Sequence, residues 1–341
     1  METGTFWDQD TEESFDMRVE LELEVMAPLF LAGANQQQAE LRSASVRGEL
    51  RYWLRAVLGG VIGDQDLSTL ADLEASVFGS TEFSSPVTVR LSAPDKQPSN
   101  YPLLPHRPDA GQAVAFPPGT RFSLILSLTP RGSAQQLAMA AWTALLWLAL
   151  GGLGRRSRRG AGSVRIKSVV ASPDSFPPIL KNSLRLATQQ ADDAQQLAAQ
   201  IETIVKNTRE AFRQFTSNTS PRFSRGLPSF SILRESTQMV VKPIDDQPIC
   251  WLMNTLSELK RTLGSKRFAE ALGGIRQDNF GGDRRASPLH ITLYQTRSGP
   301  ALIFTHLNAK ILEKNDGHPE ECRKLLDSLN GITVNLLGDK Q

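Results

Sequence analysis

Cysteine is scarce in this chain of 341 residues. Two cysteines, Cys250 and Cys322, are too few for a disulfide framework and are typical of a protein in a reducing compartment. His318 and Cys322 are spaced for one face of a helix, but a structural zinc site needs four ligands and no second pair accompanies them. No nucleophilic serine motif is present either. The sequence therefore predicts no metal, no cofactor and no catalytic residue.

The sequence also lacks a secretion signal and a run long enough to span a membrane. Six acidic residues precede the first basic residue, Arg18, whereas a secretion signal begins with basic residues. We expect residues 1–16 to form a disordered acidic tail. No residue between Ser133 and Gly154 is charged, but its apolar part, residues 137–150, is shorter than the roughly 20 residues of a span. The prediction is a buried helix in a cytoplasmic protein without membrane association.

Net charge is close to balanced. Lys and Arg number 38 against 36 Asp and Glu, which gives +2. The hydrophobic share of 40% and the charged share of 22% are ordinary for a globular protein. Overall charge therefore does not indicate nucleic-acid binding, and only local clusters of basic residues can do so.

Hydrophobic periodicity over residues 17–171 predicts a strand, a helix, two strands, a helix and a strand. Gly59, Gly60 and Gly63 are expected to end the first helix. In chain order the predicted elements occupy residues 17–31, 45–62, 86–92, 120–128, 133–150 and 163–171. This is the order of a ferredoxin-like, or βαββαβ, domain.

The same order recurs in the second half of the chain. Its predicted elements occupy residues 229–241, 249–271, 288–295, 301–307, 319–329 and 332–337. An extra amphipathic helix is predicted at 189–215, and the prolines before it indicate a boundary near residue 173. The predicted fold is α+β, with two ferredoxin-like domains and a helical insertion. Its parts are an acidic tail at 1–16, a first domain at 17–172, a linker with helical insertion at 173–228, and a second domain at 229–341.

The first basic cluster lies at a predicted helix N-terminus. Ser45 and Gly48 belong to a small, hydroxyl-bearing segment there, and free backbone N–H groups at such an end favour an anion. Arg47, Arg51 and Arg55 are four residues apart and form one stripe, from which guanidinium groups can bind phosphates. The same spacing also occurs in an ordinary amphipathic helix with solvated arginines.

The second cluster, loop 151–163, has four arginines within five residues and no acidic residue nearby. Its five glycines, Gly154 among them, let the backbone approach a ligand closely, so that N–H and guanidinium groups can face RNA phosphates. It is neither a Walker A loop nor a dinucleotide fingerprint, because it lacks Gly-Lys-Ser/Thr and leads from a helix to a strand. A solvated basic turn is the alternative. The four arginines are Arg155, Arg156, Arg158 and Arg159.

A third basic site precedes the strand predicted at 288–295. Arg284 and Arg285 follow a Gly-Gly pair and an aspartate. Contact with RNA and a surface turn before an edge strand are both open interpretations of this pair.

Five stretches together resemble the RAMP superfamily of CRISPR proteins, and within it the first-numbered subunits of the type III-B Cmr complex. The specific part is ELRSASVRGELRYWLRA (40–56) followed by GGLGRRSRRGAGSV (151–164). The shorter stretches are PLFLAGA (28–34), VFGS (77–80) and RRASPLHI (284–291). Residues 173–228 match nothing in that family.

The resemblance implies two ferredoxin-like RAMP domains in a non-catalytic RNA-binding subunit. Such a subunit holds the 3′ part of the CRISPR RNA, contacts target RNA in antiviral defence, and assembles with other Cmr subunits. The positions that it implies face RNA are Ser45, Arg47, Gly48, Arg51, Arg155, Arg156, Arg158 and Arg159. One departure is Leu54, where an aromatic residue is expected after Trp53; it bears on base stacking there and not on the fold.

Two other functions remain open at this point. A RAMP endoribonuclease that processes CRISPR RNA or cuts target RNA often uses a histidine of its first domain, and only His106 stands there, in a Pro-rich loop. A metal-dependent nuclease needs convergent carboxylates, and Asp283 has no evident partner. A generic RRM-type module shares the fold, but its aromatic strand signature is missing from residues 121–128.

Overall fold

The computed structural model describes residues 17–105, 109, 111–172, 176–217, 219–272, 274–275, 284–285, 287–307, 309 and 319–337. The acidic tail expected at residues 1–16 lies outside these ranges, as do His106, Asp283 and His318.

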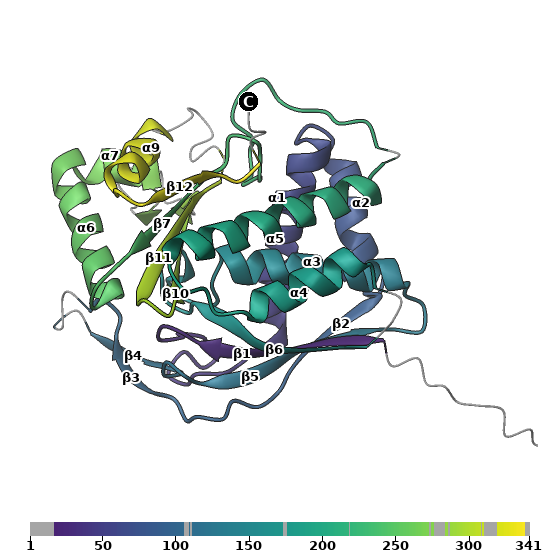
Figure 1. Ribbon diagram of the computed structural model, residues 1–341, viewed down its shortest axis with the longest axis horizontal. Coiled ribbons are helices and arrows are strands. Elements are labelled where there is room, and N and C mark those ends of the chain that lie inside the picture. The colour runs from purple at the N-terminus through teal and green to yellow at the C-terminus, as the bar shows by residue number, and fades with distance from the viewer. Residues whose placement is uncertain are drawn as a thin grey trace, which may run out of the picture.

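The first half of the chain forms a four-stranded antiparallel sheet in the order β2-β5-β1-β6. Its strands are β1 (Arg18–Val25), β2 (Val87–Leu91), β5 (Arg121–Leu128) and β6 (Val164–Ser172). Helix α1 (Ser43–Ile62) follows the first of these strands and α3 (Ala134–Leu150) follows the third. Buried and partly exposed residues alternate along β1, because helices cover only one face of this sheet (Figure 1).

The second half forms another four-stranded antiparallel sheet, in the order β10-β11-β7-β12. Its strands are β7 (Gln238–Pro243), β10 (Leu289–Gln295), β11 (Pro300–His306) and β12 (Ile332–Asn335). Helix α6 (Pro248–Leu263) follows the first of these strands and α9 (Pro319–Ser328) follows the third. The expectation of a mixed α+β fold built on antiparallel sheets is confirmed.

This second sheet is buried on both faces. Met239 and Val241 belong to the large core that includes α5 (Ala194–Phe215), whereas Val240 and Phe304 pack with α6 and α9 on the opposite face. Unbroken runs of buried residues in β10 and β11 follow from this arrangement, since both sides of each strand meet packed neighbours. Figure 1 shows α5 lying between the two sheets.

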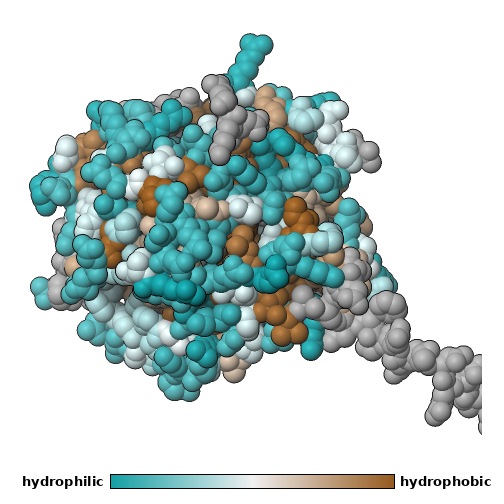
Figure 2. All heavy atoms as spheres, in the orientation of Figure 1, coloured by the Kyte–Doolittle hydropathy of each residue, from teal (hydrophilic) through white to brown (hydrophobic). Residues whose placement is uncertain are grey.

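Helix α3 is the centre of the large core. Every residue from 137 to 150 in it is buried, including Trp142 and Trp147. Ser133 and Gln136 form a capping box at its start, which satisfies backbone donors that the helix itself leaves unpaired. No helix among the described residues is long and apolar enough to cross a membrane. The prediction of a buried helix is confirmed. The face of the molecule drawn in Figure 2 is mainly hydrophilic, with small separate apolar patches.

Several elements differ from the predictions. The predicted elements did not include α2 (Leu67–Phe78), α4 (Pro178–Thr188) or the hairpin of β3 (Ser99–Pro102) and β4 (Gln112–Ala115). The strand predicted at 229–241 is confined to β7, and the helix predicted at 249–271 is divided at Gly264 into α6 and α7 (Ser265–Leu272). The short strands β8 (Gly274–Ile275) and β9 (Arg284–Arg285) complete the set.

The first helix ends at Ile62, as predicted, with Gly59 and Gly60 inside its last turn and Gly63 directly after it. Gly63, with φ of 94°, is the C-cap of helix α1. A later segment of the chain lies directly on these glycines: the backbone N–H of Leu233 donates to the carbonyl of Ala56 at 2.9 Å. A Cβ atom at Gly60 would overlap the carbonyl oxygen of Leu233. The two glycines therefore permit close packing of backbone on a helix.

Gly60→Ala is expected to lower the free energy of unfolding by about 1–3 kcal/mol, because the added methyl group overlaps the Leu233 backbone. Gly48→Ala is the matched control in the same helix, since Gly48 is exposed and no atom lies within 4 Å of the added Cβ. It is expected to raise the same quantity by about 0.5–1 kcal/mol. Urea denaturation of both variants measures the effects, and equal effects would contradict the packing argument.

Candidate nucleic-acid interface

The N-terminal end of α1 is open. Its N-cap residue, Arg42, has extended backbone, forms no capping side-chain hydrogen bond in the described structure, and is followed by no acidic residue in the first turn. Ser45 is half-buried and Gly48 is exposed, with nothing within 4 Å of where a Cβ would stand. Backbone N–H groups at such an end can bind an anion, and the helix dipole favours one.

The arginine stripe of α1 is divided between internal and external roles. Arg51 and Arg55 both reach Glu74 of α2, with Nε to carboxylate oxygen distances of 3.4 and 3.1 Å. Arg51 also donates through Nη2 to the carbonyl oxygens of Phe78 and Gly79. These contacts brace α1 against the end of α2, so both guanidinium groups are partly occupied by the protein itself.

Arg47 is the member of the stripe without such contacts. It is half-buried, and no hydrogen bond or ion pair of its side chain is found in the described part of the chain. Burial first, and then the neighbouring charge of Arg51, lowers its pKa. An incoming anion stabilises a guanidinium group that is partly desolvated and close to another cation. Arg47 is therefore the arginine of α1 best placed to receive a phosphate.

Loop 151–163 is fixed to the first half of the chain by its backbone. The N–H of Arg155 donates to Phe30 O at 2.8 Å, and that of Gly162 donates to Pro28 O at 3.0 Å. Gly154 has φ of 83°, and a Cβ there would collide with the Phe30 carbonyl. Arg156 adopts the left-handed region with φ of 61°, which is uncommon for a residue other than glycine.

The same loop is also fixed to the second sheet. Gly160 N–H donates to Ile291 O at 3.0 Å, and Thr292 Oγ1 donates to Gly151 O at 2.7 Å. Leu293 N–H donates to Ser163 Oγ at 2.8 Å. Strand β10 therefore accepts and donates hydrogen bonds along the length of the loop.

Two of the four loop arginines belong to this attachment. Arg159 donates through Nη2 to Leu272 O at 2.9 Å and through Nη1 to Ser287 Oγ at 3.1 Å, and its burial lowers its pKa to about 10. Arg158 donates to the carbonyl of Ser287, and its guanidinium carbon lies 4.9 Å from the ring centroid of Tyr52. Both hold the loop to the start of β10, and Arg158 also contacts α1 through Tyr52.

The other two loop arginines are available at the surface. Arg155 is exposed, and the described residues include no side-chain partner for it. Arg156 is half-buried, and among the described residues its side chain reaches the thioether sulfur of Met253 alone, at 3.2 Å, which is a weak acceptor. Arg284 and Arg285 form the short strand β9, and their side chains lie outside what the structure describes.

A contact between Tyr52 and His290 that the sequence did not indicate lies next to Arg158. Tyr52 Oη is 2.9 Å from His290 Nε2, and the Trp53 ring lies 5.0 Å from that histidine. Burial lowers the pKa of His290 well below its usual value, with Arg158 and Arg159 adding to the effect, so its imidazole is neutral. Burial raises the pKa of nearby Glu49 to about 7, against the opposing charge of Arg158.

The remaining titratable groups offer little chemistry. His306 is buried, and burial lowers its pKa to about 4. Cys322 is buried too, and burial raises its pKa to about 12. Within the described ranges no three His, Cys, Asp or Glu residues are grouped so as to hold a metal ion. The site can bind anions through backbone and guanidinium groups.

Comparison with known proteins connects this geometry to one family. The model of the RAMP superfamily matches residues 22–165. The CRISPR system Cmr subunit Cmr1-2 of Pyrococcus furiosus is 30% identical over 178 residues, which are 43% of this chain and 93% of that protein. Subunit Cmr1-1 of the same organism is 28% identical over 280 residues, or 74% of this chain and 76% of that protein.

Solved structures show the same fold. The crystal structure of Cmr1 from Pyrococcus furiosus in its apo form has a TM-score of 0.66 at 23% identity and covers 94% of this chain and 99% of its own. A chain in the cryo-EM structure of the type III-B Cmr-beta bound to cognate target RNA has a TM-score of 0.66 at 13% identity, covering 92% and 99%.

Arg159→Ala is expected to lower the free energy of unfolding by at least about 2 kcal/mol, because it leaves buried carbonyls near β10 without a donor. Arg155→Ala, four residues earlier in the same loop, removes the same charge from an exposed position and is expected to stay within about 0.5 kcal/mol of the parent. Chemical denaturation distinguishes the two. A stable Arg159→Ala protein would show that its contacts do not attach the loop.

Proposed function

Because the chain belongs to the Cmr1 family of the RAMP superfamily, we propose that it is an RNA-binding subunit of a type III-B Cmr effector complex. In this role it holds the 3′ part of the CRISPR RNA, contacts target RNA, assembles with other Cmr subunits and cuts neither RNA. Its relatives in Pyrococcus furiosus are named Cmr subunits, and a chain of similar fold belongs to a Cmr complex bound to cognate target RNA.

The observation that carries the proposal is the placement of the open end of α1 beside the glycine-rich loop. Phe30 O accepts from the loop at Arg155, and Leu31 O accepts from Glu40, just ahead of the helix start. The free N–H groups of α1, Arg47 and Arg155 are thus presented from neighbouring pieces of backbone. Backbone donors and guanidinium groups bind phosphates without reading bases, which suits a subunit whose sequence specificity comes from guide pairing.

RNA contacts are proposed for residues that are at least partly exposed and whose side chains are not already paired within the part of the protein that the structure describes. Ser45, Gly48, Arg47, Arg155 and Arg156 contact RNA directly. In the same proposal the arginines with internal partners position these residues: Arg51 and Arg55 through α2, and Arg158 and Arg159 through β10. Arg284 and Arg285 add a contact from the second half of the chain.

The proposed domain organisation is two ferredoxin-like domains, residues 17–172 and 229–341, joined by a helical insertion at 173–228. Supporting it, both sheets have the order second-third-first-fourth strand, with a helix after the first and after the third strand. The insertion supplies α4 and α5, and α5 packs against both α3 and β7. The two domains therefore share one core through that helix.

Affinity purification of the tagged chain from its host under mild conditions tests the proposed function. CRISPR-repeat-derived RNA and other RAMP subunits are expected to accompany it, and recovery of the chain alone or with unrelated RNA would contradict the assignment. The purified chain is expected to leave CRISPR precursor and target RNA uncut. Cleavage that is lost in His106→Ala or Asp283→Ala would identify an endoribonuclease instead.

The double variant Arg47→Ala/Arg155→Ala is expected to weaken RNA binding and to lower the slope of log Kd against log salt concentration by about 1.4, since each phosphate contact on a single strand contributes about 0.7. Arg90→Ala/Arg185→Ala removes the same charge from exposed positions on β2 and α4 and is the control. Its slope is expected to match that of the parent. Equal slopes in all three proteins would exclude Arg47 and Arg155 as phosphate contacts.

A further inference from the structure

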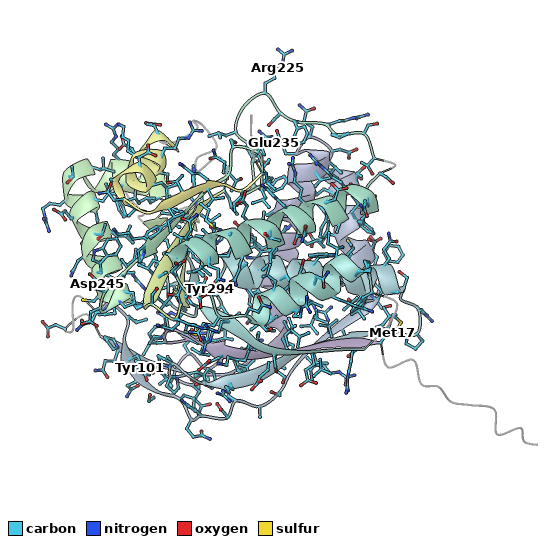
Figure 3. All side chains as sticks on the ribbon, viewed as in Figure 1. Met17, Tyr101, Arg225, Glu235, Asp245 and Tyr294 are labelled. Atoms are coloured by element: carbon cyan, nitrogen blue, oxygen red, sulfur yellow. The ribbon has the colours of Figure 1, made fainter. Side chains whose placement is uncertain are left out.

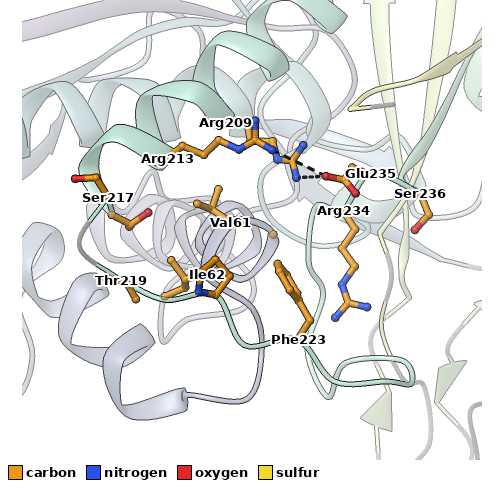
Figure 4. A pocket seen from close by; sticks show the side chains of 13 residues that line it. Val61, Ile62, Arg209, Arg213, Ser217, Thr219, Phe223, Arg234, Glu235 and Ser236 are labelled. Atoms are coloured by element: carbon orange, nitrogen blue, oxygen red, sulfur yellow. Dashed lines mark hydrogen bonds and ion pairs between the residues drawn. The ribbon is translucent and has the colours of Figure 1, made fainter. Parts of the chain in front are cut away.

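A cavity of about 630 Å³ opens at the other end of α1 (Figure 4). It lies between residues 60–62 of that helix, the C-terminal end of α5 and segment 219–236. At about 1.5 Å per residue of helix, it is roughly 25 Å from the first turn of α1, so it is separate from the candidate interface. Its volume falls within the range of about 300–1,000 Å³ that is usual for small-ligand sites.

Three guanidinium groups line this cavity, from Arg209 and Arg213 of α5 and from Arg234 of segment 219–236. Asp64, which is 4% exposed, accepts from Arg234 at 2.9 Å and fixes it in place. Glu235 is the single acidic residue of the lining; its carboxylate oxygen is 2.8 Å from Arg209 and 4.0 Å from Arg213 (Figure 4). Arg213 also lies 3.9 Å from Glu210, one turn earlier on α5. Arg209 and Arg213 are close enough to share the Glu235 carboxylate, so the two cations repel one another and favour an anion between them.

Two donors in the cavity wall are unpaired. The Nε atoms of Arg209 and Arg234 are buried, and neither has a hydrogen-bond partner within the described structure. The side chain of Arg209 is only 11% exposed, so water does not readily replace the missing partner. Buried donors are paired in most native structures, so the guanidinium groups of this wall are incompletely satisfied by the protein itself.

The Glu235 carboxylate, which is paired with Arg209 and Arg213, can be displaced by a ligand. Glu235 is 68% exposed, and an ion pair at such exposure contributes little to stability. Figure 3 shows Glu235 at the base of the segment, near α5, and Arg225 at its outer tip. A ligand with two or three acceptor oxygens can displace Glu235 and bind both Arg209 and Arg213 at once.

An aromatic ring stands beside the arginines. Phe223 is 43% exposed, and the guanidinium carbon of Arg234 lies 5.3 Å from its ring centroid. The hydroxyl residues Ser217 and Thr219 line the same cavity. An exposed ring next to phosphate-binding guanidinium groups is the usual combination for a nucleotide, whose base stacks while its phosphate is bound.

From these groups we infer that the cavity binds one ribonucleotide, with its phosphate at Arg209 and Arg213 in place of Glu235 and its base against Phe223. The inference goes beyond the proposed function, because the cavity and the candidate interface share no residue. The ligand is either a free mononucleotide or one nucleotide of an RNA strand, since both present the same phosphate and base.

Titration of the purified full chain with uridine 5′-monophosphate, uridine and inorganic phosphate tests this site. Arg213→Gln is expected to weaken binding of the monophosphate about tenfold or more, and its position at 51% exposure leaves the fold intact. Phe223→Ala is expected to weaken the monophosphate but not inorganic phosphate. Glu235→Gln is expected to tighten the monophosphate about three- to tenfold, because it removes the competing carboxylate. Arg185→Gln, exposed on α4, is the charge control and is expected to change nothing.

The Glu235→Gln variant makes the test decisive, because a merely structural ion pair would give no gain in affinity. Absence of saturable binding to the parent chain, or an unchanged affinity in Glu235→Gln, would overturn the site. So would binding of an acidic peptide in preference to the nucleotide. If Arg213→Gln also weakens a short oligouridylate, the ligand is part of an RNA strand; if it weakens only the monophosphate, the ligand is a free nucleotide.

The same titration separates this site from the proposed function. Arg47→Ala/Arg155→Ala is expected to leave binding of uridine 5′-monophosphate unchanged, because neither residue lines the cavity. Loss of RNA binding in that variant with intact nucleotide binding supports both sites. Loss of nucleotide binding there would overturn the independence of the cavity.

Discussion

Backbone hydrogen bonds hold loop 151–163 between the two sheets. Its N–H groups donate to Phe30 O on one side and to Ile291 O on the other, and Thr292 returns a hydrogen bond to its first carbonyl. Buried groups of this kind must be paired, so a shift of one sheet against the other would leave several of them unsatisfied together. The position of the loop relative to the N-terminal end of α1 depends on this attachment, and so does the geometry that a ligand bound between them would meet.

Helix α1 serves both candidate sites, one at each end. Its first turn is uncapped and presents free N–H groups, whereas its last turn forms a wall of the arginine-lined cavity. The glycine pair Gly59 and Gly60 in this last turn lets the segment around Leu233 lie on the helix backbone, and the segment thereby brings Arg234 and Glu235 to the cavity. A single rigid element thus fixes the position of two anion-binding surfaces, and the packing that allows it depends on residues with no side chain.

Arginines that look alike in the sequence have different roles in the structure, and burial decides between them. Arg159 is surrounded by carbonyls and its pKa is lowered by burial, while Arg155, four residues earlier, faces solvent. A buried guanidinium requires acceptors, and the carbonyls at the start of β10 supply them. An exposed one has no such need and is free to bind a partner.

The sequence by itself determined the order of the strands of the two four-stranded sheets, the buried helix α3, the alternation of β1 and the presence of basic clusters, because these depend on local periodicity and on charges close in the chain. The motifs at residues 40–56 and 151–164 were also specific enough to predict the family from the sequence. Only the tertiary structure decided that Arg51 and Arg55 brace α2, that Gly59 and Gly60 accept a crossing backbone, and that Arg209 and Arg234 share a cavity. Those partners are separated by tens to hundreds of residues, and a side chain's desolvation and hydrogen bonding are fixed by neighbours in space, which one-dimensional spacing does not specify.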